Sequence, residues 1–169
     1  LKIAGLLSAL GASPCAGQPT YDIVDLTEAA APLGVAQCEG RAINEGVRRA
    51  PCDCVIIIDD DAELADETVV QRLLDTLASD PLIGMAGASI VVSPEATAFQ
   101  RRAARQFPRL ATPVVSETTD SDMACHGCCA IRRAVFDAIG GEREDIIRGL
   151  DPDLRVRMRD AGYRVVLAP

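Results

Sequence analysis

Two patterns of apolar and polar residues alternate along this chain, and together they predict an α/β fold. Apolar runs of strand length predict strands at residues 21–26, 54–59, 84–92, 123–131 and 164–167. Helical spacing and Gly, Pro or Asp boundaries predict helices at residues 1–10, 40–50, 67–79, 94–106, 133–139 and 149–162. The alternation indicates a three-layer α/β/α sandwich with a mostly parallel sheet. We expect residues 1–169 to form one domain and, since the chain begins at Leu1, a fragment of a longer protein.

The most informative strand ends in a run of acidic residues. Residues 55–58 are all β-branched, as in a strand that is buried on both faces, and Asp59, Asp60 and Asp61 follow directly. Carboxylates at such a strand end lie where open α/β sheets bind ligands. Their mutual repulsion would be relieved by Mg²⁺ that carries substrate phosphates. A solvated acidic turn is the alternative, and these residues alone do not decide between the two.

Composition limits the classes of partner. The net charge is −8, which argues against a nucleic-acid or anionic-membrane surface. No apolar run is long enough to span a bilayer, so we expect membrane association only through segments outside this sequence. The seven cysteines are odd in number and clustered, which favours free thiols in a reducing compartment. We therefore expect a cytoplasmic protein, with the inner face of the membrane as a further location.

A phosphatase of the haloacid-dehalogenase type is one way to explain the acidic run. Its nucleophile loop has the form D-x-D-x-T after an apolar strand, which Asp59 and Asp61 fit. However, Glu63 stands where that loop requires Thr, and the only lysine, Lys2, lies upstream instead of downstream. We regard this reading as the weaker one.

Four segments in order resemble the family 2 glycosyltransferases. They are similar to the family's G-x-A-x-N-x-G helix, its "LDDDTEL" form of the D-x-D motif, its G-x-x-x-I-R-R-x-V-F segment with a following Gly-Gly, and its G-E-D-x-D-L…R…A-G-Y-R-V segment. The segments are residues 40–46, 58–64, 127–141 and 149–165. Each is weak alone, but four in the family's order form a specific signal.

The resemblance implies a GT-A fold and inverting transfer of sugar from a nucleotide-diphospho-sugar (UDP, GDP or dTDP) to a carbohydrate, lipid-linked or peptide acceptor. In that reading Asp59 and Asp61 hold Mg²⁺ or Mn²⁺ on the donor diphosphate. Asp25, Asn44 and Asp60 would bind the donor, and His126 and Gly127 the acceptor. Asp151 would be the general base that deprotonates the acceptor hydroxyl.

Three departures from the family pattern keep other readings open. The family usually has an acidic residue where this chain has Leu150, and Asp151 before Pro152 also fits a simple helix N-cap. The family's first strand, ending in P-x-x-N, has no counterpart here, and no Q-x-x-R-W motif of the processive branch is present. The alternatives are a catalytically silent GT-A domain that binds nucleotide sugar or serves as a scaffold, and a nucleotidyltransferase.

Two further clusters have both a structural and a functional interpretation. Cys125, His126, Cys128 and Cys129, joined by Cys52 and Cys54, would supply zinc ligands, but small buried residues on a strand explain them better. Three arginines in one predicted helix form either a solvated face or a dock for an anionic acceptor; they are Arg101, Arg102 and Arg105.

Overall fold

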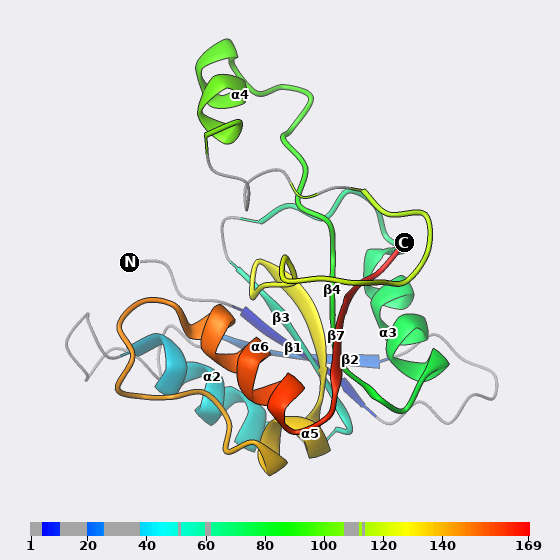
Figure 1. The fold of residues 1–169 in the computed structure, drawn as a ribbon, viewed down its shortest axis with the longest axis vertical. Helices are drawn as coiled ribbons and strands as arrows, with labels where there is room; N and C mark the ends of the chain where they lie inside the picture. The colour runs from blue at the N-terminus through cyan, green and yellow to red at the C-terminus, as the bar shows by residue number, and fades with distance from the viewer. Residues whose placement is uncertain are drawn as a thin grey trace.

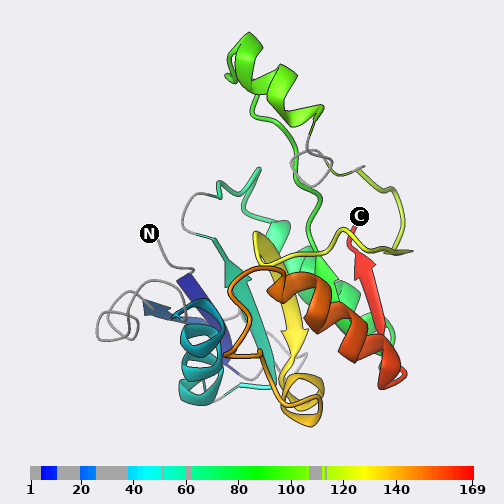
Figure 2. The ribbon, with the colours of Figure 1, turned by 60° about the vertical axis from the view of Figure 1, so that its left-hand side comes forward.

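In a computed structural model of the chain, a mixed sheet lies between helices on its two faces (Figures 1 and 2). The structure describes residues 5–10, 20–25, 38–50, 52–59, 62–106, 112 and 114–169, with only the backbone for 5–10, 20–25 and 38. The strands are β1 (Gly5–Leu10), β2 (Thr20–Asp25), β3 (Cys54–Ile58), β4 (Ile83–Gly87), β5 (Thr119–Asp120), β6 (Cys128–Arg132) and β7 (Arg164–Leu167). The helices are α2 (Cys38–Arg49), α3 (Val69–Ser79), α4 (Ala98–Ala104), α5 (Arg133–Ala138) and α6 (Leu150–Asp160).

The seven strands have the order β2-β1-β3-β6-β4-β7-β5, and the prediction of a mostly parallel sheet is wrong. Among the described strands, only β4 and β7 pair in parallel. Among the described residues between β4 and β6, α4 is the only helix and the short strand β5 follows it; α4 projects away from the body of the molecule (Figure 1). Because no helix of that connection packs on the sheet, β6 returns antiparallel between β3 and β4.

The N-terminal segment also differs from its prediction as a helix over residues 1–10. Gly5–Leu10 is the strand β1, which pairs with β2 on one side and β3 on the other. Two neighbouring strands satisfy its backbone groups, and this tertiary pairing outweighs a local helical preference. Fewer residues separate β1 from β2 than a crossover requires, so the two strands run antiparallel.

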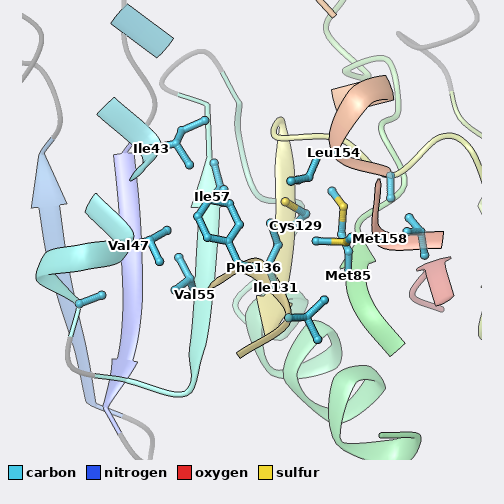
Figure 3. Close-up of a cluster of buried hydrophobic side chains, with 14 of the residues drawn as sticks. Ile43, Val47, Val55, Ile57, Met85, Cys129, Ile131, Phe136, Leu154 and Met158 are labelled. Carbon is cyan, nitrogen blue, oxygen red and sulfur yellow. The ribbon is translucent and has the colours of Figure 1, made fainter. Parts of the chain in front are cut away.

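Both faces of the sheet are apolar, as the unbroken run in β3 predicts. Val55 and Ile57 face the core beneath α2, α5 and α6, whereas Ile56 faces α3. Figure 3 shows the first core, in which Phe136 of α5 and Leu154 of α6 cover the sheet. All five of these side chains are buried. The strand is therefore held from both sides, and its end is fixed in space.

The helix predictions hold for the main packing elements, with shifted ends. Helix α3 buries Val69, Leu73 and Leu77, and it begins one residue after Thr68. Asp66 is not the N-cap; its carboxylate accepts hydrogen bonds from the Thr68 amide and hydroxyl. Helix α4 is shorter than the predicted range of 94–106, because Thr97 starts it in a capping box with Gln100.

The strand register brings several strand ends to one edge of the sheet. Gly5 lies opposite Asp25 on one side and opposite Ile58 on the other, so β2 and β3 end at the same level. Gly87, the last residue of β4, lies beside Cys129 and Leu167 near this same edge. The residue that follows β3, Asp59, is therefore at the ligand-binding edge that open α/β sheets use.

Candidate active site

Asp59 is placed by the backbone of the central strand. Its amide donates a hydrogen bond to the carbonyl of Gly127 at 3.3 Å, and its own carbonyl accepts one from the Ala62 amide at 3.1 Å. These bonds turn the chain out of the sheet as soon as β3 ends. The Asp59 side chain is half-buried there. Asp60 and Asp61 lie outside the described residues, so their roles stay predictions.

Asp151 lies in the first turn of α6, and its prediction as the N-cap is wrong. The helix begins at Leu150, and the N-cap is Gly149 in the left-handed conformation at φ 92°. The Asp151 carboxylate instead contacts His126: Oδ1 accepts a hydrogen bond from the backbone amide at 2.7 Å and lies 3.3 Å from Nδ1. The side chain remains 26% exposed. A helix N-terminus also stabilises a carboxylate in this position.

Residues 125–127 connect the two carboxylates. His126 holds Asp151, and the adjacent Gly127 accepts the amide of Asp59. Burial raises the pKa of the Cys125 thiol, and the negative charges of Asp151 and Asp59 raise it further. One short segment, which contains the predicted site residues His126 and Gly127, thus contacts two more, Asp59 and Asp151, that are distant from it in the sequence.

Glu142 is a site residue that the sequence analysis missed. Its carboxylate is fully buried, and Oε1 lies 2.9 Å from Nε2 of His126, whose side chain is 3% exposed. Glu39 of α2 approaches Nδ1 at 3.9 Å. Burial by itself lowers the pKa of His126, but the neighbouring carboxylates of Glu142, Glu39 and Asp151 raise it well above the ordinary value. The only sequence signal for Glu142 is its place directly after Gly140-Gly141.

Asn44 fixes the loop that carries Glu142. Its Oδ1 accepts from the Glu142 amide at 2.7 Å, and its Nδ2 donates to the Glu142 carbonyl at 2.9 Å. A Cβ on Gly141 would lie 2.6 Å from Asn44 Oδ1, and Gly141 has φ +71°, so glycine is required at that position. Asn44 therefore joins α2 to this loop, and its donor-binding role stays a prediction.

Asp25 and Leu150 complete the predicted site. Asp25 is the last residue of β2, at the sheet edge where Asp59 follows β3. Leu150 is buried beside Asp151 and packs near Gly40 of α2. The residue before Asp151 thus occupies an interior position, and an apolar side chain is suited to it.

The cysteines do not form a zinc site in the described part of the chain. The cysteines at positions 52, 54, 125, 128 and 129 form no disulfide, and no group of three or more metal-binding side chains is found among the described residues. Burial raises the pKa of Cys128 to about 11, with smaller contributions from Cys125 and Asp59. Without a cation beside it, such a thiol stays protonated at neutral pH.

The fold and the site define an α/β enzyme domain that presents carboxylates from several elements at one sheet edge. Residues 37–140 match the family described as Glycosyl transferase family 2, and the chain belongs to this family. It therefore has a GT-A fold and is a glycosyltransferase that binds a nucleotide-sugar donor and an acceptor. A search of curated proteins gave no significant match.

The family match decides between the two enzyme classes considered for the chain. It supports a glycosyltransferase over a haloacid-dehalogenase-type phosphatase. The matched segment includes Asn44, Asp59, His126 and Gly127, and it ends before Asp151. The role of Asp151 therefore depends on its contacts and on the sequence resemblance. No helix in the described ranges is long and apolar enough to cross a membrane.

Proposed function

We propose that this domain transfers a sugar from a nucleotide-diphospho-sugar to an acceptor hydroxyl with inversion at the anomeric carbon. The observation that carries the proposal is the pairing of Asp59 and Asp151 through residues 125–127. One carboxylate belongs to a rigid strand end, and the other to a helix start that keeps partial exposure. Donor and acceptor groups require this kind of fixed geometry to react.

Asp151 is the group that takes the acceptor proton. Its Oδ1 is engaged by His126, and no described group donates a hydrogen bond to Oδ2. In the proposed step Oδ2 accepts the proton while the acceptor oxygen bonds to the anomeric carbon. The bond from that carbon to the diphosphate oxygen breaks, and the nucleoside diphosphate leaves with the electron pair. A single displacement of this kind inverts the anomeric configuration.

A divalent metal is part of the proposal. Asp59 is a hard oxygen ligand at the sheet edge, and Mg²⁺ or Mn²⁺ needs only one or two protein carboxylates beside substrate phosphates, so the donor chemistry of this edge fits the ion. Asp59 and Asp61 would hold it. When bound, the ion would neutralise negative charge on the leaving diphosphate. Asp25, Asn44 and Asp60 are the proposed donor contacts, and Gly127 borders the acceptor side.

A panel of donors tests the proposal. The protein is incubated with UDP-glucose, UDP-N-acetylglucosamine, GDP-mannose or dTDP-glucose, with Mn²⁺ or EDTA, and release of nucleoside diphosphate is measured. We expect Mn²⁺-dependent hydrolysis of at least one donor, with the sugar released first as the inverted anomer in proton NMR spectra. Binding without turnover would support the silent domain instead. Release of pyrophosphate from a nucleoside triphosphate and a sugar phosphate would support the nucleotidyltransferase.

A further inference from the structure

A cluster of ionisable side chains lies beneath Asp151. Glu142, with no exposed side-chain surface, and His126, 3% exposed, face each other at 2.9 Å. Asp151 contributes from α6 and Glu39 from α2, at 3.3 Å and 3.9 Å from Nδ1 of the imidazole. Arg157 of α6 lies near this loop, where it donates to the Gly141 carbonyl and pairs with Asp153. The cluster therefore joins α2, α6 and the loop after α5 around one imidazole.

Electrostatics fix the charge of this imidazole. A fully buried carboxylate is costly unless a cation or donors compensate it, and His126 is the group that faces the Glu142 carboxylate. If the imidazole were neutral, three carboxylates would surround it and the buried charge of Glu142 would have no compensating cation at the ring. A doubly protonated ring places positive charge 2.9 Å from Glu142 at Nε2, and 3.3 Å from Asp151 and 3.9 Å from Glu39 at Nδ1.

We propose that Glu142 holds His126 as an imidazolium, and that this pair positions Oδ1 of Asp151 so that Oδ2 is left to take the acceptor proton. The role of Oδ2 rests on the proposed glycosyl transfer, whereas the charge of His126 and its hold on Asp151 do not. The His126 amide donates a hydrogen bond to Oδ1 at 2.7 Å, and the charged ring attracts the same oxygen from 3.3 Å, so one orientation of the carboxylate is favoured. Glu142 and His126 are thus positioning residues that act through Asp151.

The composition of the chain offers a direct readout, because His126 is its single histidine. Selective ¹⁵N-histidine labelling of the whole protein gives one backbone amide and two ring nitrogens, all from this residue. At pH 7.5, about one unit above the ordinary histidine pKa, we expect both ring nitrogens to show the shifts of a doubly protonated imidazolium. A neutral ring at this pH would overturn the proposal, and the measurement needs neither a variant nor a substrate.

Substitutions of the surrounding carboxylates separate their contributions to the charge of the His126 ring. Glu142→Gln is expected to make the ring mostly neutral at pH 7.5, and Glu39→Gln, whose carboxylate is 55% exposed, to change it less. Glu117→Gln, on an exposed residue outside the cluster, serves as the matched control and should change nothing. If Glu142→Gln does not fold, Glu39→Gln and Asp151→Asn still test the charge of the ring. Each removes one carboxylate beside Nδ1 and leaves Glu142 in place, so the ring should stay doubly protonated if Glu142 holds it.

The backbone amide proton of His126 reports on the position of Asp151. The His126 amide proton should lie far downfield in the wild-type protein because it donates to Asp151 Oδ1, and Asp151→Asn should shift it upfield. We expect Glu142→Gln to shift the same proton in the same direction and to reduce kcat of donor hydrolysis about tenfold or more with little change in KM. An unchanged amide signal in Glu142→Gln would overturn the positioning role. If no donor is turned over while these signals behave as expected, the proposed reaction fails and the buried pair stands.

Discussion

The two carboxylates of the candidate site are held in different ways. Asp59 follows a strand that is packed on both faces, and backbone hydrogen bonds fix its turn. Asp151 is held through its carboxylate: the amide and the ring of His126 contact it, Glu142 contacts the ring, and the Asn44 side chain fixes the Glu142 backbone. The first arrangement is built from backbone bonds at the end of a strand with a local sequence signature, and the second from contacts of side chains in distant segments. The first should therefore tolerate changes in its surroundings, whereas the second should depend on each partner.

The largest effect is expected for Asp151→Asn. The amide keeps the size of the side chain but cannot accept the acceptor proton, so turnover should fall by about 10³-fold, within the range of general-base catalysis. Donor binding, measured by calorimetry with Mn²⁺, should stay within about threefold of the wild type. Asp160→Asn, at the exposed end of the same helix, is the control and should keep full activity. Comparable turnover in Asp151→Asn would exclude the residue as the base.

Asp59→Asn should weaken the metal-dependent binding of the donor. Because the neutral amide is a poorer ligand for a hard cation, we expect about a 10²-fold loss of Mn²⁺-dependent donor affinity. The variant keeps the main-chain bonds of the Asp59 turn and the size of the side chain, so the free energy of unfolding should change by less than about 1 kcal/mol. Glu63→Gln, an exposed residue just after the turn, is the control. Donor binding that is equally strong with EDTA and with Mn²⁺ would contradict the metal role.

Glu142→Gln should lower the free energy of unfolding much more than Asp59→Asn does. Removal of one partner from a buried ion pair costs about 3–5 kcal/mol, since it leaves the other charge uncompensated. Urea denaturation followed by circular dichroism would measure the loss. An exposed ion pair serves as the comparison. Arg143→Ala breaks the contact with Asp145 and should cost no more than about 1 kcal/mol. Equal losses in the two variants would show that the Glu142 carboxylate is not paired in solution.

The sequence predicts the Asp59 region better than the Asp151 region, for a physical reason. A strand buried on both faces has a local signature, and Val55 to Ile58 carry it. The family motifs likewise point to Asp151 and Asn44. The contact of His126 with Glu142 has no such signature, because it joins residues that only the folded sheet brings together. The helix prediction for residues 1–10 and the parallel direction predicted for most strands, β6 included, are wrong for the same reason: strand pairing depends on neighbours that are distant in the chain.

The pH dependence of stability should report the same buried pair. Partners raise the pKa of His126 in the folded state, so its contribution is fully present below the unfolded pKa of about 6.5 and is lost as pH rises through the folded value. In that window the unfolding free energy should fall by about 1.4 kcal/mol per pH unit from this one group. Urea curves at several pH values would show the slope, and Glu142→Gln should flatten it. If the unfolding free energy of the wild type instead rose with pH over this range relative to that of Glu142→Gln, the proposed charge of His126 would be contradicted.

Gly127→Ala should give the smallest effect and the sharpest test of whether the two regions are independent. A Cβ at this position would lie 3.3 Å from Ile90 Cδ1, 3.4 Å from Cys125 Sγ and 3.8 Å from Asp59 Oδ2, and the first two are side-chain atoms that can yield. We therefore expect a loss of stability below about 1 kcal/mol and a modest decrease in Mn²⁺-dependent donor affinity, since the methyl group approaches the Asp59 carboxylate. The His126 ring signals should not change, because Asp59 bonds to the Gly127 carbonyl whereas Asp151 contacts the amide and the ring of His126. A shift of those ring signals would show instead that residues 125–127 transmit a change at Asp59 to Asp151, and the two carboxylates would then act as one coupled unit.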